Sequence, residues 1–281
     1  MLDSIKRTMF AVILTCAMQS WGWATVPKNF KSSRIEILYV QPTDPAHQNI
    51  YEVLQQRHIL ERFKGYLSPL RLPRTLLLKT AGCDGEVNAW YEESEHSVTV
   101  CYEYLAEVLR NAPDSTTAGG VTSEDAIVGP TVEVFLHEIG HATFNMLKVP
   151  IFGREEDAAD QFAAYLMLHL EKDVARQTVN GVAFMYGHEA LSQDPKLKQF
   201  SDVHGVSAQR FYNLLCLAYG ADAQQFAYLV EKEYLPQSRA EGCEDEYKQV
   251  DYAFRKLIYP YLDQTKLKNV QRKKLLRPAH K

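Results

Sequence analysis

Residues 131–147 read TVEVFLHEIGHATFNML, and this stretch gives the clearest indication of the fold. Apolar side chains occupy nearly its whole circumference at helical spacing, which predicts a helix that is buried on all sides. His137, Glu138 and His141 lie within it, and burying such groups costs free energy unless each finds a partner. The rest of the fold must therefore supply hydrogen-bond partners or a metal ion for them.

These three residues form the pattern His-Glu-x-x-His. On a helix, His137 and His141 lie one turn apart on one face, so both imidazoles can reach a single metal ion. Glu138 is rotated by about 100° from His137 and lies beside such a metal rather than on it. The alternative is a pair of core histidines that are hydrogen-bonded to their neighbours, with Glu138 reaching solvent.

A short connection with Pro150 and Gly153 as helix breakers leads into a second predicted helix over residues 155–171. Glu156 and Asp160 are four residues apart and share a face, and small alanines let this helix approach its neighbour closely. Close approach is needed because a carboxylate ligand lies about 2.0–2.2 Å from zinc. Asp160 is suited to accept the second ring N–H of a ligand histidine. An acidic first turn that the helix dipole stabilises is the simpler interpretation, and both can hold at once.

Together the two helices resemble the zinc site of the gluzincin metallopeptidases, of which thermolysin is the familiar member. A nearer resemblance is to a bacterial family of proposed metallopeptidases, and it covers most of the chain after the N-terminal segment. The matching stretches are Asn88–Tyr91, Cys101–Glu103, His137–His141, Gly153–Phe162 and Gln209–Tyr212. The run GREEDAADQF at residues 153–162 is the most specific of them.

The resemblance implies a gluzincin-like catalytic core in which His137, His141 and Glu156 bind zinc and Glu138 is the general base. It also implies that Asp160 supports one of the ligand histidines through a hydrogen bond. Glu156 follows His141 at a shorter spacing than in thermolysin, so the likeness to that enzyme is confined to the metal site.

Two further features concern substrate handling. Asn88-Ala89 resembles the edge strand of gluzincins, to which an extended peptide adds by backbone pairing, and an ordinary strand is the alternative. In the sequence Asp202-Val203-His204, the aspartate could orient His204 to stabilise an oxyanion, which makes His204 a second catalytic candidate. A helix-capping aspartate beside a surface histidine also explains this pattern, and Tyr212 is a rival for the same role.

The order of the predicted elements favours an α+β fold, with a small N-terminal sheet followed by a mainly helical core. Strands are predicted over 34–40, 73–79, 88–91 and 97–102, and the polar turn at residues 92–96 joins the last two. Helices are predicted over 49–63, 103–111, 131–147, 155–171, 183–190, 207–219, 223–234 and 244–261. We expect one domain over residues 25–265. The tail over 266–281 carries only positive charges, and it either binds an anionic surface or is a solvated terminus.

Residues 1–24 have the three parts of a secretory signal peptide. Lys6 and Arg7 supply positive charge, residues 9–18 are apolar, and Gly22 and Ala24 are the small residues that a signal peptidase reads. A membrane anchor would need about 20 apolar residues, and no later stretch is apolar enough to span a bilayer. We therefore predict a protein without a membrane span that is exported to the periplasm or secreted.

Removal of that segment leaves four cysteines, Cys83, Cys101, Cys216 and Cys243. An even number of cysteines in an exported chain favours disulfides. We expect the pairs Cys83–Cys101 and Cys216–Cys243 because each is close in sequence and flanks a plausible hairpin. Buried free thiols are the alternative, and they would suit a cytosolic protein better.

Composition excludes several classes of protein. The 281-residue chain is 46% hydrophobic and 23% charged, which excludes a disordered, collagen-like or coiled-coil chain. A formal charge of −4 offers no basic excess for nucleic acid. We therefore predict an exported zinc-dependent peptidase that cleaves a peptide or protein through a zinc-activated water, with Glu138 as base. The alternative is a non-catalytic exported zinc-binding protein that binds a partner in the same cleft.

Overall fold

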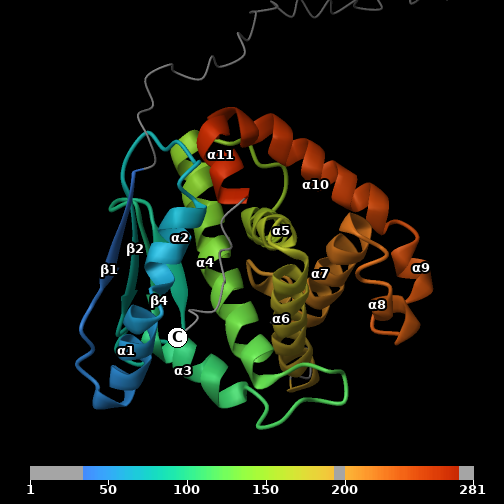
Figure 1. Cartoon of the computed structure of the whole chain (residues 1–281), viewed down its shortest axis with the longest axis horizontal. Coiled ribbons are helices and arrows are strands. Elements are labelled where there is room, and N and C mark those ends of the chain that lie inside the picture. Colours follow the sequence, from blue (N-terminus) through green and yellow to red (C-terminus); the bar gives the residue numbers. More distant parts are fainter. Residues whose placement is uncertain (1–33, 193–199, 272–281) are drawn as a thin grey trace, which may run out of the picture.

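The computed structural model describes residues 34–192 and 200–271, so the predicted signal peptide and the end of the basic tail lie outside the described residues. The fold is α+β, as predicted, with one small sheet beside a mostly helical body (Figure 1). The four strands are β1 (Ile35–Tyr39), β2 (Leu76–Ala81), β3 (Ala89–Glu92) and β4 (Ser97–Cys101).

The strands are ordered β1-β2-β4-β3. β1, β2 and β4 are mutually parallel, and β3 pairs antiparallel with β4 as the hairpin predicted from the polar turn between them. All five residues of β4 are buried, which fits a strand with neighbours on both sides and other elements over its faces. β3 therefore forms one edge of the sheet in the described part of the chain.

Two helices, α1 (Gln48–Gln56) and α2 (Ile59–Tyr66), cover one face of the sheet (Figure 1). The prediction of a single helix over 49–63 was wrong. His58 adopts the left-handed conformation with a φ of 54°, which breaks the helical path after one short helix and starts the next. A single 3-10 turn, η1 (Pro45–His47), precedes α1.

The centre of the molecule is α4 (Ser123–Leu147), which follows α3 (Tyr102–Asn111). α4 packs against β3 and β4 and also against α5 (Glu155–Leu168) and α6 (Lys172–Ser192). It begins eight residues before the predicted start at Thr131, because Thr122 and Asp125 form a capping box and Pro130 is accommodated inside the helix. Most of its residues are buried, as predicted.

The crossing of α4 and α6 depends on two glycines. A Cβ on Gly181 would overlap the carbonyl oxygen of Asp125, and one on Gly129 would lie 2.7 Å from the carbonyl oxygen of Thr178. The two helix backbones therefore approach more closely than any side chain at these positions would allow. This close approach brings α6 alongside the part of α4 that precedes the histidine motif.

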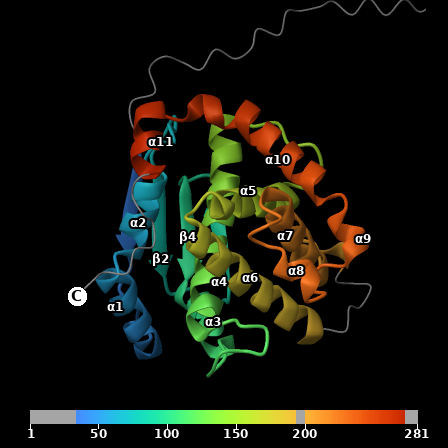
Figure 2. The ribbon, with the colours of Figure 1, turned by 45° about the vertical axis from the view of Figure 1, so that its right-hand side comes forward.

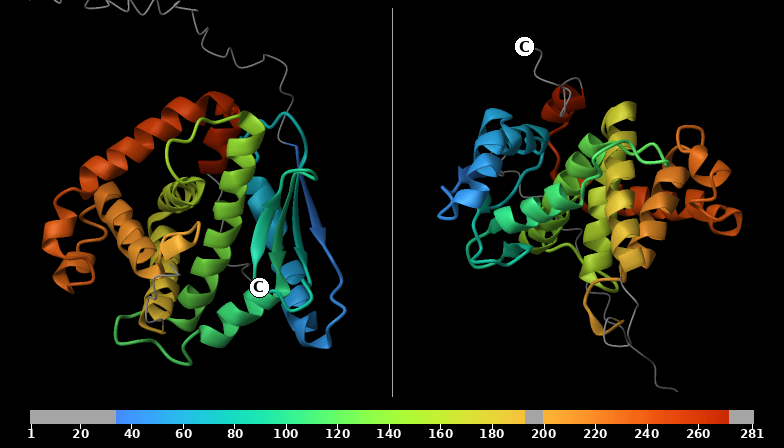
Figure 3. Two further views of the ribbon diagram at one scale, coloured as in Figure 1. Left: turned by 180° about the vertical axis from the view of Figure 1, so that it is seen from behind. Right: turned by 90° about the horizontal axis from the view of Figure 1, so that it is seen from below.

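The remaining helices are α7 (Ser207–Ala221), α8 (Tyr228–Glu231), α9 (Gln237–Ala240), α10 (Cys243–Leu257) and α11 (Gln264–Gln271), with η3 (Tyr259–Tyr261) before the last. α10 packs on α7 and α5, and α11 returns toward α2 (Figure 2). The helix predicted over 223–234 is mostly turns, and the one over 244–261 ends at Leu257. Figure 3 shows α10 from behind, arching over the helical body.

Both expected disulfides are present. Cys83–Cys101 ties the loop before β3 to the end of β4, and Cys216–Cys243 ties α7 to the start of α10. Within residues 34–192 and 200–271, none of the helices has both the length and the apolarity that crossing a membrane requires.

Candidate metal centre

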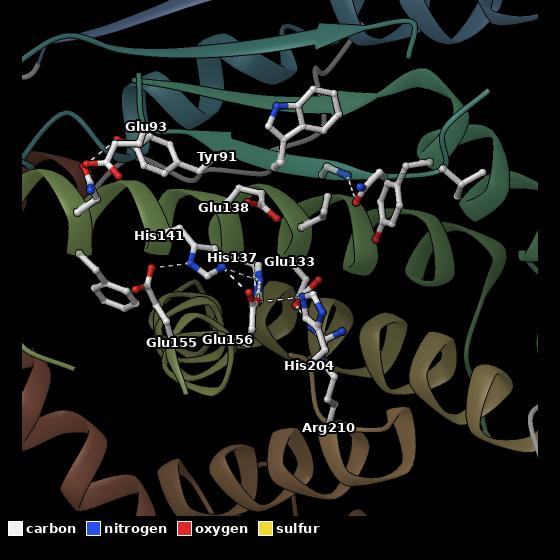
Figure 4. Close-up of a pocket in the computed structure, with 18 of the residues that line it drawn as sticks. Tyr91, Glu93, Glu133, His137, Glu138, His141, Glu155, Glu156, His204 and Arg210 are labelled. Atoms are coloured by element: carbon white, nitrogen blue, oxygen red, sulfur yellow. Dashed lines mark hydrogen bonds and ion pairs between the residues drawn. The ribbon is translucent and has the colours of Figure 1, made fainter. Parts of the chain in front are cut away.

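Three imidazoles surround one carboxylate oxygen where α4, α5 and the segment before α7 meet (Figure 4). Oε2 of Glu156 lies 3.1 Å from Nε2 of His137 and 3.2 Å from Nε2 of His141. The Nε2 of His204 lies 2.9 Å from the same oxygen. The two motif histidines also face each other, with their Nε2 atoms 3.2 Å apart. Residues that lie far apart in the sequence thus converge on one point.

The distances within this group suit a small metal ion. Two ligands at about 2.0–2.1 Å from a tetrahedral zinc lie roughly 3.3 Å apart. The atoms of His137, His141 and Glu156 lie 3.1, 3.2 and 3.2 Å from one another. A second combination, His137, Glu156 and His204, also has its ligand atoms within 4.8 Å of one another. Nitrogen and oxygen donors in this number are typical of zinc sites.

The Nδ1 atom of each motif histidine lies within hydrogen-bond distance of a carboxylate. The Nδ1 of His137 lies 2.9 Å from Oδ1 of Asp160, and the Nδ1 of His141 lies 2.9 Å from Oε1 of Glu155. Such a hydrogen bond fixes the orientation of an imidazole and leaves its Nε2 free for a metal. The second carboxylate, Glu155, was not identified from the sequence as a site residue.

A buried charge network lies beyond Asp160. Arg210 donates two hydrogen bonds to Asp160, at 2.8 and 2.6 Å, and its Nη2 lies 3.4 Å from Oε1 of Glu133. The Tyr186 hydroxyl donates to the same Glu133 oxygen at 2.8 Å, and the guanidinium lies over the Tyr186 ring. Sequence reasoning missed this network. The position of Glu133, one helical turn before His137, could have indicated that it lies near the site. No residue near Arg210 in the sequence links it to Asp160.

Opposite charges lie close together in the group around Glu156. Burial disfavours the charged form of His137, but hydrogen bonds to Asp160 and Glu156 raise its pKa to about 10. Hydrogen bonds from the three imidazoles hold the pKa of Glu156 far below its usual range. Although burial opposes ionisation, His137 and Arg210 lower the pKa of Asp160 to about 2. The positive and negative groups therefore stabilise each other, as a bound cation would stabilise the carboxylates.

Glu138 differs from the other acidic residues of the site. Its side chain is 8% exposed, lines the cleft and makes no hydrogen bond to any described residue. Burial raises the pKa of this carboxyl, against the smaller opposing influence of the two histidine charges. Figure 4 shows Glu138 on the side of α4 nearer the strands, away from the group around Glu156.

His204 lies at the edge of the same group and is partly exposed. Asp202 Oδ1 lies 3.1 Å from its Nδ1 and also accepts its backbone N–H at 2.9 Å, so this aspartate orients the ring. The hydrogen bond to Glu156 raises the pKa of His204. Tyr212, the rival candidate, is exposed and does not line the cleft.

The group opens into a cleft of about 860 Å³. The residues of β3 and those just before it form one wall, and α4, α5 and α6 form the floor and the opposite wall. Asn88 and Ala89, which resemble a gluzincin edge strand, lie on this wall. The cleft is therefore bordered by a sheet edge on one side and by the histidine motif on the other.

The model of a family described as "Putative metallopeptidase" matches residues 39–258, more than three quarters of the chain. No curated protein and no solved structure matches the chain. The matched range contains the three imidazoles, Glu156 and the whole cleft wall. The chain belongs to this family.

Proposed function

We propose that the protein is an exported zinc-dependent peptidase that hydrolyses peptide bonds in the cleft beside β3. One observation carries the proposal: two imidazole nitrogens and one carboxylate oxygen lie 3.1–3.2 Å from one another at the base of that cleft. His137, His141 and Glu156 would hold the metal, in the manner of a gluzincin. Zinc bound there would polarise the scissile carbonyl and lower the pKa of a water molecule.

Glu138 is suited to be the general base. It follows His137 in the sequence and lines the same cleft as the proposed ligands, it is not engaged by another described residue, and burial raises its pKa toward the range in which a carboxyl can both take and return a proton. It would accept a proton from the attacking water and deliver it to the leaving amine. A protein that only bound zinc and a partner would not need a free carboxylate at this position.

His204 would donate a hydrogen bond to the oxygen that becomes negatively charged as water attacks. Asp202 holds its ring, and hydrogen bonds of this kind stabilise an oxyanion. Asp160 and Glu155 would fix the two ligand imidazoles. The free edge of β3 would bind the peptide backbone as an added strand. The two disulfides support export, since such bonds persist in oxidising compartments.

The test is cleavage of a mixed peptide library by the purified, zinc-loaded protein, followed by mass spectrometry. We expect Glu138→Gln to lower the rate by about 10²–10⁴-fold while zinc stays bound, because the side chain keeps its shape and loses its basicity. Glu124→Gln, at the exposed start of the same helix, is the matched control and should leave the rate unchanged. Zinc-loaded protein that cleaves no library peptide would favour the non-catalytic zinc-binding alternative.

A further inference from the structure

One end of the cleft is lined by both apolar and polar side chains, and we call this end the side pocket. Val134 of α4 and Met185 of α6 provide apolar walls, and Tyr104 of α3 and Glu189 of α6 provide polar groups. Met185 and Glu189 are one helical turn apart and so share a face of α6. The Tyr104 hydroxyl lies 3.7 Å from the Met185 sulfur, so these two side chains contact each other.

Glu189 presents a negative charge that no described cation neutralises. Its Oε2 accepts a hydrogen bond from the Ser207 hydroxyl at 2.9 Å, at the first residue of α7. Within the described residues no lysine or arginine forms an ion pair with it, and Arg210, the arginine of this cleft, is already bonded to Asp160 and Glu133.

Tyr104 adds a second polar atom that is poorly satisfied. Tyr104 is half-buried, and the only hydrogen-bond partner of its hydroxyl in the described structure is a thioether sulfur, which is a weak acceptor. Burial, with the nearby charges of Glu133 and Glu189, raises the pKa of Tyr104 well above its usual range, so the phenol stays neutral. Its oxygen can therefore accept a hydrogen bond from a cationic ligand while its own proton faces Met185.

The cleft as a whole is also anionic. Among residues 34–192 and 200–271, six glutamates line it against one lysine and one arginine. Even a divalent metal leaves an excess of negative charge on its walls, and such a cleft concentrates cationic ligands. Apolar walls that end in a carboxylate and a phenol oxygen suit a long alkyl chain with a terminal charge, which is the shape of lysine and arginine.

The direction of β3 indicates which side of the scissile bond of a bound peptide would face this pocket. β3 runs from Ala89 to Glu92, and the Tyr91 hydroxyl near its end reaches Asn145, which follows His141 on α4. Val134 precedes His137, so the side pocket lies at the other end of the cleft, near Glu133 in Figure 4. A peptide that pairs antiparallel with β3 runs from the Asn145 end toward the Val134 end. The residue after the scissile bond then faces Glu189.

We propose that the cleft selects peptides with a lysine or arginine immediately after the scissile bond and that Glu189 determines this preference. The proposal rests on the proposed peptidase function and deepens it by naming the substrate class. The alternative is a purely structural role, in which Glu189 only accepts a hydrogen bond at the start of α7. In that case activity would not depend on the charge of the substrate.

The experiment has a binding arm and a cleavage arm. In the first, Glu138→Gln protein is titrated with short fluorescent peptides that differ only by lysine, alanine or glutamate at one position. In the second, wild-type, Glu189→Gln and Glu189→Lys proteins cleave the same peptides. We expect Glu189→Gln to lower kcat/KM for lysine peptides by at least about tenfold and to leave alanine peptides within about threefold. Glu189→Lys should favour glutamate peptides, with zinc content and melting temperature unchanged in both variants.

The two arms separate the possible failures. If wild-type protein cleaves peptides but treats lysine, alanine and glutamate alike, the proposed preference is overturned and the peptidase function stands. If lysine peptides bind selectively and depend on Glu189 but nothing is cleaved, the anionic pocket for a cationic side chain stands and the peptidase function falls. If both variants lose zinc or unfold, Glu189 has a structural role and the proposal is wrong.

Discussion

Arg210→Ala should be among the most destabilising substitutions at the site, because Arg210 is the cation shared by two buried acids. It donates two hydrogen bonds to Asp160 and approaches Glu133 at 3.4 Å. The side chains of Arg210, Asp160 and Glu133 are only 18, 23 and 7% exposed. Removing the guanidinium leaves Glu133 without its ion-pair partner and leaves Asp160 with only the His137 imidazole, in a place that water reaches poorly.

The magnitude follows from this burial. Breaking a buried ion pair by removing one partner costs about 3–5 kcal/mol, and for a domain of this size each kcal/mol lowers the melting temperature by roughly 2–4 °C. We therefore expect a fall of at least about 6 °C. In the variant, the folded-state pKa values of the two carboxyls rise, so stability is lost as the pH increases through them. The deficit should accordingly be larger at pH 8 than at pH 5.

The assay is thermal unfolding of the metal-free protein, with Arg154→Ala as the matched control. Arg154 also donates two hydrogen bonds to an aspartate, Asp157, at 2.9 and 3.0 Å, but these side chains are 45 and 40% exposed. An exposed pair contributes about 0–1 kcal/mol. Equal losses in the two variants, or a loss in Arg210→Ala that does not depend on pH, would refute the buried network as the source of stability.

Further substitutions test other parts of the account. Gly181→Ala should cost about 3 kcal/mol or more, because its methyl group would collide with the α4 backbone, whereas Gly65→Ala, with open space around it, should be neutral or stabilising in the same melting experiment. His204→Ala should lower kcat by about 10²–10³-fold and retain zinc, and loss of zinc on metal analysis would make His204 a ligand instead. Peptide mapping without reductant should recover both disulfides, and any other main pairing would contradict the fold.

Local patterns predicted the elements that depend on near neighbours. The β3–β4 hairpin and the buried central helix were predicted correctly, because alternation, turn residues and all-round apolarity act over a few residues. The start of α4 was missed because proline usually breaks a helix and Pro130 precedes the predicted start. The capping box at Thr122 instead begins the helix about two turns before Pro130. The break at His58 was missed because no glycine marks its left-handed conformation.

The candidate site was predictable in part for the same reason. His137, Glu138 and His141 share a local motif, and the helical spacing of Glu156 and Asp160 indicated a facing helix. The parts that were missed depend on tertiary packing. Arg210 meets Asp160 across 50 positions of sequence, and Glu189 lines the cleft only because α6 crosses α4 closely at its glycines.

Zinc content is the most direct test of the central claim, which is that His137, His141 and Glu156 hold one zinc ion while Glu138 does not. Purified wild-type, Glu138→Gln and Glu156→Gln proteins are dialysed against equal zinc and iron and then analysed for both metals. We expect one zinc per chain for wild-type and Glu138→Gln, and a clear loss for Glu156→Gln, because that variant lacks the anionic ligand. Zinc lost from Glu138→Gln but kept by Glu156→Gln, or iron in place of zinc in the wild type, would contradict it.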